Sequence, residues 1–202
     1  LEDPNVEPPA ESFQWTRGAE TRNLKERIVE IGFERGIPVS LNGKRKVALA
    51  LIKELNALGS AYGIGRMDMI ENRLVGIKSR ETYEAPAATI LLQAHRDLEA
   101  LTLDRELLHY KEGISQKYAE LVYYGLWFTP LRGALDAFVE LTQKKVTGSV
   151  RVKLRKYSSH VVGRKSPYSL YRENLATYSE KDKFDQRLAK GFIDLWALPY
   201  RK

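Results

Sequence analysis

Apolar residues near the start of the chain follow a period of two. They occupy every second position from 29 to 33 and again from 37 to 41, and the second run ends at the dipeptide Asn42-Gly43. Alternation of this kind is typical of a strand with one buried face, and an Asn-Gly pair favours a tight turn. The pattern therefore predicts a β-hairpin region that ends at this turn.

The apolar positions that follow are spaced for helices. From Lys46 to about Leu58 they keep the spacing of one helix face, and Gly59 and Gly63 offer a stop after this predicted helix. Pro86 can occupy the first turn of a longer helix. The predicted buried stripe of that helix contains Ile90, Leu91, Ala94, Leu98 and Leu101. Further helices are predicted around residues 115–125, 130–143 and 185–196.

A second alternating segment predicts another hairpin. Residues 146–156 place Val150, Val152 and Leu154 on one side of a strand and basic residues on the other. Residues 158–165 are the predicted partner strand. Since strands and helices are mixed along the chain, we expect an α+β fold with a mixed or antiparallel sheet and several helices.

The net charge of +7 is concentrated around this second hairpin. Residues 144–172, which we call the basic hairpin, contain nine Lys or Arg residues and no Asp or Glu, whereas the rest of the chain is close to neutral. This segment is either a solvated cationic face or a surface for an anion such as RNA. Tyr157, Tyr168 and Tyr171 would be available for stacking on bases. The solvated face is the preferred interpretation, because no RNP, KH or helix-turn-helix pattern is present.

Composition indicates a globular protein. The 202 residues are 43% hydrophobic, and no stretch has the roughly twenty uninterrupted apolar residues of a membrane span. Residues 1–26 are polar and Pro-rich, and we expect them to form an extended arm in which Phe13 and Trp15 could dock. The chain has no Cys, which excludes disulfides and fits a reducing compartment, so the cytoplasm is the expected location.

Motifs for catalysis are scarce. His95, His109 and His160 are far apart and lack the spacing of metal ligands, so no metal site is predicted. Phosphate-binding glycine loops and a nucleophile elbow are also missing from the sequence. The acidic pair Asp68 and Glu71 is of a kind common on solvated surfaces. These residues alone therefore favour a binding domain over a catalytic one.

The most charged stretch is GRMDMIENRLVGIKSR, residues 65–80, which is predicted to be extended at Met67 and Met69. Together with its flanks, as GIGRMDMIENRLVGIKSRETYEAP, it closely resembles the signature of argininosuccinate synthase, in the part of that enzyme that follows the nucleotide-binding domain. Other segments agree in the same order: VEIGFERGIPVSLNG, PAATILLQAHRDLEALTLDRE, KYAELVYYGLWFTPLR, VTGSVRVKL and VVGRKSPYSLY. The resemblance implies that residues 27–202 form the α+β synthetase domain of this family.

The resemblance also implies a reaction. Members of this family use ATP with magnesium to adenylate the ureido oxygen of citrulline, and the aspartate amine then displaces AMP to give argininosuccinate and pyrophosphate. The nucleophile is a substrate amine, so the protein's task is to position two amino acids and a nucleotide. The resemblance further implies a cytoplasmic homotetramer that takes part in arginine biosynthesis and the urea cycle.

By the same resemblance, Glu71 and Tyr83 are expected to contact citrulline. A carboxylate suits an ammonium group, and a phenol can orient a polar end without adding charge. A supporting network is expected from Arg66, Asp68, Arg73, Lys78 and Arg80. The structural alternative is that Glu71 pairs with Arg66 or Arg73 and that Tyr83 is a core aromatic residue.

The chain departs from the family pattern in several places. The S-G-G-x-D-T-S loop, the G-x-T-x-K-G-N-D segment and a serine-containing citrulline segment do not occur, so the nucleotide-binding domain is expected to be absent. ATP and magnesium would then bind mainly elsewhere, with no catalytic residue in this chain, and the isolated chain is predicted to be inactive. Glu81 replaces a small residue, and the chain stops at LPYRK, where some relatives continue into a further helix.

Two functions are therefore considered. The first is the citrulline-binding and oligomerisation half of argininosuccinate synthase, which would self-associate and act only when joined to its nucleotide-binding half. The second is a non-catalytic interaction module that binds an anionic partner such as RNA through the basic hairpin.

Overall fold

The computed structural model describes residues 1–16, 18–176 and 185–201. The chain divides into two compact units, Leu1–Tyr168 and Ser169–Lys202. The strands are β1 (Arg27–Glu34), β2 (Ile37–Leu41), β3 (Lys44–Arg45), β4 (Arg66–Asn72), β5 (Lys78–Glu84), β6 (Gly148–Arg155) and β7 (Ser158–Lys165). The α-helices are α1 (Ala48–Ala61), α2 (Pro86–Thr102), α3 (Arg105–Tyr123), α4 (Pro130–Gln143), α5 (Glu173–Ala176) and α6 (Leu188–Trp196). These elements confirm the predicted α+β class.

Five strands form an antiparallel sheet in the order β3-β2-β1-β6-β7. Both predicted hairpins are confirmed, and β1 joins them because it pairs with β2 on one side and with β6 on the other. Asn42 and Gly43 have φ angles of 50° and 75°, so they make the tight turn expected of an Asn-Gly pair, here between β2 and β3.

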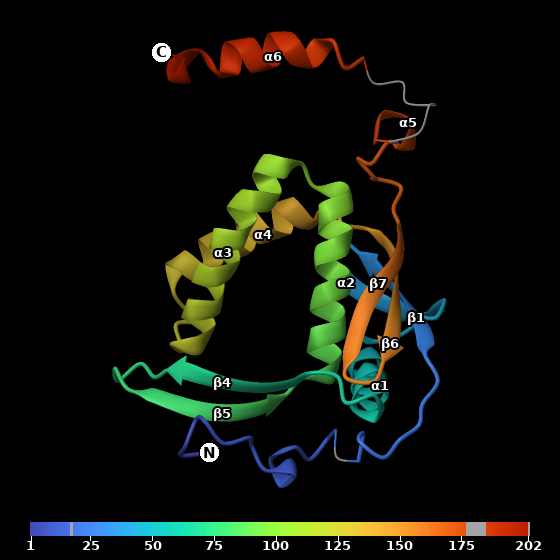
Figure 1. Ribbon diagram of the computed structural model, residues 1–202, viewed down its shortest axis with the longest axis vertical. Helices are drawn as coiled ribbons and strands as arrows, with labels where there is room; N and C mark the ends of the chain where they lie inside the picture. Colours follow the sequence, from blue (N-terminus) through green and yellow to red (C-terminus); the bar gives the residue numbers. More distant parts are fainter. Residues whose placement is uncertain (17, 177–184, 202) are drawn as a thin grey trace. The chain divides into compact units, whose positions relative to one another are not determined.

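One face of this sheet carries the hydrophobic core. The inward positions of β1 and β6 are fully or almost fully buried, as their alternation predicted: Val29, Ile31, Phe33, Val150, Val152 and Leu154. Helices α1 and α2 pack against each other and against the sheet, α1 on β2 and α2 on β6 and β7 (Figure 1). Ile90, Ala94 and Leu98 form the fully buried stripe of α2, while Leu91 and Leu101 are half-buried at its edges.

Gly59 does not stop α1, contrary to the prediction, because the helix continues to Ala61. A Cβ atom at Gly59 would lie 2.7 Å from the Cβ atom of Pro86, so this glycine allows α1 and α2 to approach closely. The turn that follows α1 contains Gly63, whose φ of +72° is the left-handed conformation expected after a helix.

Helices α3 and α4 contact each other beyond α2. The sequence predicted only the second part of α3, whereas the helix begins at Arg105, where the side chain of Asp104 accepts a hydrogen bond from the N–H of Leu107 at 3.0 Å. The connection to α4 exposes large apolar side chains, above all Phe128, which is 94% exposed.

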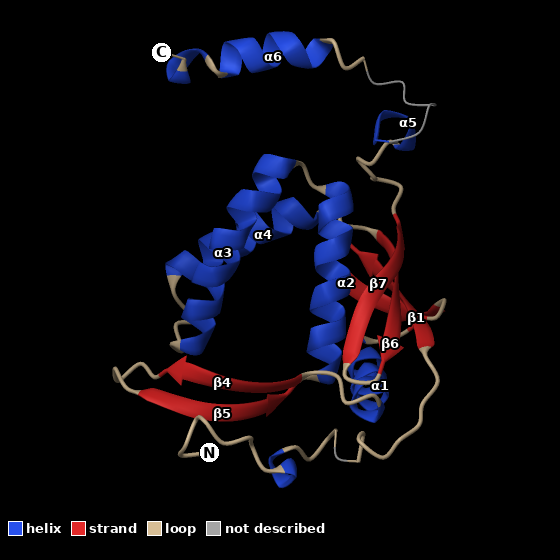
Figure 2. Ribbon diagram, in the orientation of Figure 1, coloured by secondary structure: helices blue, strands red, loops and turns tan. Residues whose placement is uncertain are grey.

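Strands β4 and β5 form a separate two-stranded sheet, which we call the ribbon (Figure 2). β4 confirms the expected extended conformation at Met67 and Met69, and β5 was not predicted. At the base of the ribbon, the N–H of Ala85 donates to the carbonyl of Gly65 at 2.9 Å. Glu81 lies within β5 in an uninterrupted register, so the departure at this position does not disturb the hairpin.

The second unit contains α5, α6 and a short 3₁₀ turn, Leu198–Tyr200. The predicted last helix is confirmed from Leu188 to Trp196, and the rings of Phe192 and Trp196 stack at 5.5 Å. Among the described residues, none of the helices combines the length and the apolar character needed to cross a membrane.

Candidate functional site

The ribbon sorts the predicted site residues onto two faces. Successive residues of a strand point to opposite faces, and residues paired across the ladder share a face. Met67 pairs with Tyr83 and Glu71 pairs with Ser79, so Glu71 and Tyr83 belong to the same face, which we call the front face. Asp68, Ile70 and Arg80 belong to the opposite, rear face.

On the front face, Glu71 and Tyr83 are in direct contact. The Tyr83 hydroxyl donates to Glu71 Oε2 at 3.0 Å, although the two residues are four positions out of register, because the tyrosine side chain leans along the strand. This hydrogen bond raises the pKa of Tyr83, so the phenol stays protonated. The site thus presents a carboxylate fixed by a neutral hydroxyl, a pair that can accept a hydrogen bond from an ammonium group and orient a second polar group.

The structural alternative was that Glu71 pairs with Arg66 or Arg73 and that Tyr83 is a core aromatic residue. The structure shows neither of these arrangements among the described residues. Tyr83 is 41% exposed and is not part of the core. Within the described parts of the chain, Glu71 makes no ion pair, because Arg73 binds Glu81 at 2.6 Å and Ser79 at 2.9 Å, and Arg66 lies at the other end of the ribbon. Glu71 therefore has acceptor capacity that its protein neighbours do not use.

Four of the five predicted supporting residues lie away from Glu71: Arg66 at the base of the ribbon, and Asp68, Lys78 and Arg80 on the rear face. Arg80 makes two hydrogen bonds to Asp68, at 2.9 and 2.7 Å, and this interaction lowers the pKa of Asp68. Lys78 donates to the side chain of Asn72 at 2.7 Å. On the rear face, Arg80 also donates to the carbonyl of Asp3 at 2.7 Å, so this face binds the start of the arm. Of the predicted network, Arg73 shares the front face through its bonds to Ser79 and Glu81.

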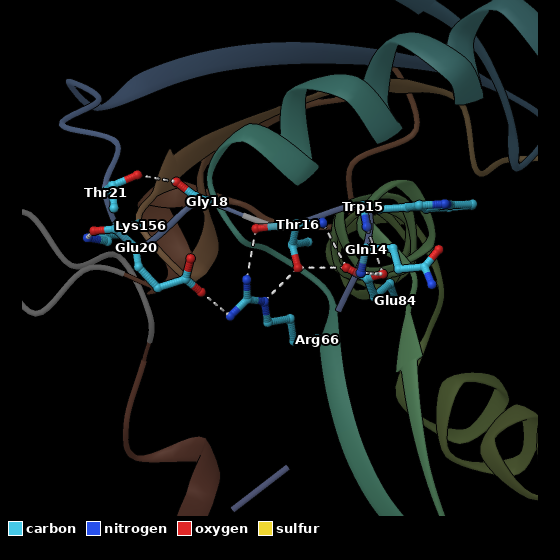
Figure 3. A network of polar contacts seen from close by, with 9 residues as sticks. All are labelled: Gln14, Trp15, Thr16, Gly18, Glu20, Thr21, Arg66, Glu84 and Lys156. Atoms are coloured by element: carbon cyan, nitrogen blue, oxygen red, sulfur yellow. Dashed lines mark hydrogen bonds and ion pairs between the residues drawn. The ribbon is translucent and has the colours of Figure 1, made fainter. Parts of the chain in front are cut away.

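The rear face of the ribbon base holds a second network, which the sequence did not predict (Figure 3). Glu84 accepts hydrogen bonds from three consecutive arm N–H groups, those of Gln14, Trp15 and Thr16, at 2.7 to 2.8 Å. Arg66 binds Thr16 and forms an ion pair with Glu20 at 2.6 Å. These partners lie about 50 to 70 positions apart in sequence, so no local spacing could have revealed them.

The two arm aromatics behave differently in this network. Phe13 docks, because its ring centroid lies 4.7 Å from the guanidinium carbon of Arg66, which is a cation–π contact. The indole of Trp15 is 59% exposed, and this residue is anchored through its backbone N–H instead.

Two opposing effects act on the pKa of the Glu84 carboxyl group. Burial raises its pKa, but hydrogen bonds from the Thr16 hydroxyl and from the three N–H groups lower it more, so the pKa lies below its ordinary value. A group with a lowered folded-state pKa contributes stability above its unfolded pKa, and this contribution is lost as the pH falls through the folded pKa. The attachment of the arm should therefore be strongest at neutral pH.

Acidification is expected to remove the extra stability that Glu84 gives the folded chain compared with a glutamine at the same position. The difference in melting temperature between wild type and Glu84→Gln should be constant near neutral pH and should shrink below about pH 4.5, the ordinary pKa of a glutamate. Thermal unfolding followed by circular dichroism at a series of pH values measures this. Glu112→Gln, at an exposed position of α3, serves as the control and should show no such change. If the difference in melting temperature between wild type and Glu84→Gln stayed constant into the acid range, the Glu84 carboxylate would not be what attaches the arm.

Three of the nine basic residues of the basic hairpin pair with carboxylates outside it. Lys153 and Arg155 pair with Glu26, and Arg164 pairs with Asp97. The ring of Tyr157, one of the predicted stacking residues, lies beside the guanidinium of Arg66, 5.7 Å away. The fold therefore pairs part of this cationic face internally, while Tyr168 and Tyr171 stay exposed.

The histidines have structural or solvated environments. His95 contacts Gln143 at 2.8 Å and packs near the ring of Phe33, while His109 is exposed and His160 is half-buried. In the parts of the chain that the structure describes, no group of three or more His, Asp or Glu side chains could hold a metal ion.

Comparison with known proteins gives consistent matches. The family model described as "Arginosuccinate synthase C-terminal domain" matches residues 1–202. An argininosuccinate synthase of Synechococcus sp. (strain JA-3-3Ab) is 58% identical over 201 residues, which cover 100% of this chain and 50% of the relative. That of Trichodesmium erythraeum (strain IMS101) is 59% identical over 202 residues, with 100% and 50% covered. That of Rubrobacter xylanophilus is 56% identical over 202 residues, with 100% and 49% covered. The chain spans about half the length of the curated relatives it matches.

Proposed function

Because this chain belongs to the argininosuccinate synthase family, we propose that it supplies the citrulline-binding and subunit-contact half of a carbon–nitrogen ligase. The complete enzyme would join citrulline to aspartate with ATP, releasing AMP and pyrophosphate, as a step of arginine biosynthesis and the urea cycle. The shared name of the relatives supports the ligase class, and the finer assignment to citrulline rests on the front face of the ribbon.

The observation that carries this proposal is the contact between Glu71 and Tyr83. The Glu71 carboxylate is half-buried and would accept a hydrogen bond from the ammonium group of citrulline. Tyr83 holds that carboxylate in place through its 3.0 Å hydrogen bond and would present its hydroxyl oxygen to a second polar group of the substrate. Both residues belong to short strands paired along their whole length, so the site is built on regular structure.

In this proposal the chain contributes binding and orientation. The amine of aspartate is the nucleophile, so no side chain of the protein needs to attack citrulline. Holding the two substrates at the correct distance and angle turns a bimolecular encounter into an effectively intramolecular step. Accordingly, we assign no catalytic residue to this chain.

We propose that ATP with magnesium binds mainly to the nucleotide-binding half of the enzyme. Magnesium prefers carboxylate oxygens, water and substrate phosphates. The described residues do not bring together the acidic side chains for such a site, and the carboxylate of Glu84 is already filled by N–H and hydroxyl donors. We therefore assign no reaction step through the metal to this chain.

We further propose that the enzyme is a cytoplasmic homotetramer. The connection between α3 and α4 exposes apolar side chains, including Trp127 and Phe128, that a subunit contact could cover. RNA binding is not proposed, because part of the basic hairpin pairs with Glu26 and Asp97 and its sequence contains no RNP, KH or helix-turn-helix pattern.

Glu71→Gln is expected to weaken citrulline binding in the reconstituted enzyme, in which this chain is joined to the nucleotide-binding half of a relative. The substitution keeps the size of the side chain but removes its charge. A hydrogen bond between charged groups is worth on the order of 1.5 to 3 kcal/mol, so the affinity for citrulline should fall roughly ten-fold or more. The affinity for ATP should change little. Tyr83→Phe should act in the same direction but less strongly, since only a neutral hydroxyl is lost.

Titration of each variant with citrulline and with ATP, alongside a melting curve, tests this assignment. Glu112→Gln removes the same charge from an exposed helix position and should leave both affinities unchanged. Equal losses of affinity for the two ligands, or a fall in melting temperature large enough to explain the loss, would refute the role of Glu71.

A further inference from the structure

Thr16 is completely buried although it lies in the extended arm. Its N–H and its hydroxyl both donate to the same oxygen of Glu84, at 2.7 and 2.6 Å. Its hydroxyl oxygen and its carbonyl accept hydrogen bonds from Arg66, at 2.6 and 2.8 Å. Figure 3 shows the side chains of Arg66 and Glu84 converging on it. Every polar group of Thr16 is therefore bonded to one of two ribbon residues.

Arg66 and Glu84 are themselves register partners, the first residue of β4 and the last residue of β5. A single arm residue thus fastens both strands at the point where the ribbon leaves the rest of the unit. An isolated two-stranded hairpin is marginally stable in water, so a ribbon of this kind needs support from outside itself. The arm supplies such support on the rear face at two places, at Thr16 and through the carbonyl of Asp3, which binds Arg80.

The anchor also helps to fix where Tyr83 points, together with the ladder that pairs β5 with β4. Tyr83 precedes Glu84 in β5, and adjacent residues of a strand point to opposite faces. When Glu84 is fixed on the rear face, rotation of the strand about its axis is blocked. The Tyr83 ring is then directed over the front face, where its hydroxyl reaches Glu71.

We propose that Thr16 is a positioning residue for the citrulline site, acting through Arg66 and Glu84 to hold the ribbon and so to keep Tyr83 on Glu71. This inference rests on the proposed function, because it takes Glu71 and Tyr83 as the groups that bind citrulline. It adds that a segment on the opposite face of the ribbon controls the affinity for that substrate.

Hydrogen exchange of the 202-residue chain tests the structural part of the inference. Thr16→Val keeps the shape of the side chain but removes the hydroxyl, and the amides of β4 and β5 should exchange about five-fold faster. Thr16→Ser restores the hydroxyl and should return exchange close to wild type. Thr21→Val is the matched control, since the Thr21 hydroxyl donates within the arm to the carbonyl of Gly18 at 3.0 Å. Unchanged exchange of β4 and β5 in Thr16→Val would overturn the inference.

Citrulline titration of the reconstituted enzyme tests the functional part. Thr16→Val should weaken citrulline binding about five-fold while leaving the affinity for ATP unchanged, and Thr16→Ser should rescue it. A purely structural role would instead lower the melting temperature and weaken both ligands, which would overturn the inference. Measuring Glu71→Gln in parallel distinguishes a failure of the positioning role from a failure of the proposed function. If Glu71→Gln weakens citrulline binding and Thr16→Val does not, only the positioning role fails. If Glu71→Gln has no effect, the proposed function fails and the positioning role falls with it.

Discussion

The 202-residue chain by itself is expected to form no argininosuccinate from ATP, citrulline and aspartate, and to release no pyrophosphate. Adenylation requires donors that stabilise the charge on the departing pyrophosphate, which proteins usually provide with glycine-rich loops and helix N-termini. No glycine-rich phosphate loop occurs in the sequence. On the front face of the ribbon, the Glu71 carboxylate would repel a phosphate, and the Tyr83 hydroxyl already donates to that carboxylate. The expected effect is complete loss of turnover.

A coupled pyrophosphate assay with and without citrulline measures this expectation. Addition of the nucleotide-binding half of a relative, as a fusion or a second chain, should restore release that depends on citrulline. Without aspartate, release should stop after a single turnover, because the citrulline adenylate then meets no amine that displaces AMP. Citrulline-dependent pyrophosphate release by the isolated chain would show that the assignment of ATP to the other half is wrong.

Leu98→Ala is expected to cause the largest loss of stability. Leu98 is fully buried on α2, in the core cluster formed with the inward residues of β1 and β6. Truncation of a buried leucine removes apolar contacts and leaves a cavity, and it typically costs about 2 to 5 kcal/mol of unfolding free energy. Such a loss is a large fraction of the stability of an ordinary domain.

Urea unfolding followed by circular dichroism measures the cost. Leu92→Ala is the matched control, because Leu92 lies on the same helix but is 59% exposed, and its effect should stay within about 0.5 kcal/mol. If the two variants lost equal stability, the contact face assigned to α2 would be wrong.

The sequence predicted the elements whose side chains alternate between a core and solvent. Val29, Ile31 and Phe33 show this in β1, and Ile90, Ala94 and Leu98 show it in α2, because burial on one face imposes the period. β5 was missed because neither face of the ribbon is buried, and a strand of charged and small polar residues carries no such period. Gly59 was wrongly predicted to end α1, because glycine is favoured both at the end of a helix and where two helices pack closely.

The candidate site depends on contacts that local patterns cannot encode. Glu71 and Tyr83 were identified only by resemblance to a family, and their contact follows from the lean of Tyr83 along the ribbon. The anchor formed by Thr16 and Glu84 joins residues 68 positions apart. The charge of the basic hairpin was correctly counted, but Glu26 and Asp97, which pair with three of its basic residues, lie outside the segment, so only the fold reveals these ion pairs.

The order of strands in the large sheet also affects how the chain is made. β1 is synthesised well before one of its two neighbours, β6, which the ribosome completes only at Arg155. Until then one edge of an apolar strand stays unpaired, and pairing over such a long separation is slow because the intervening loop has to close. An open strand edge is a template for association with other chains. The edge of β1 is therefore open to association while α1 to α4 are emerging, and chaperone protection of this sheet would matter during that interval.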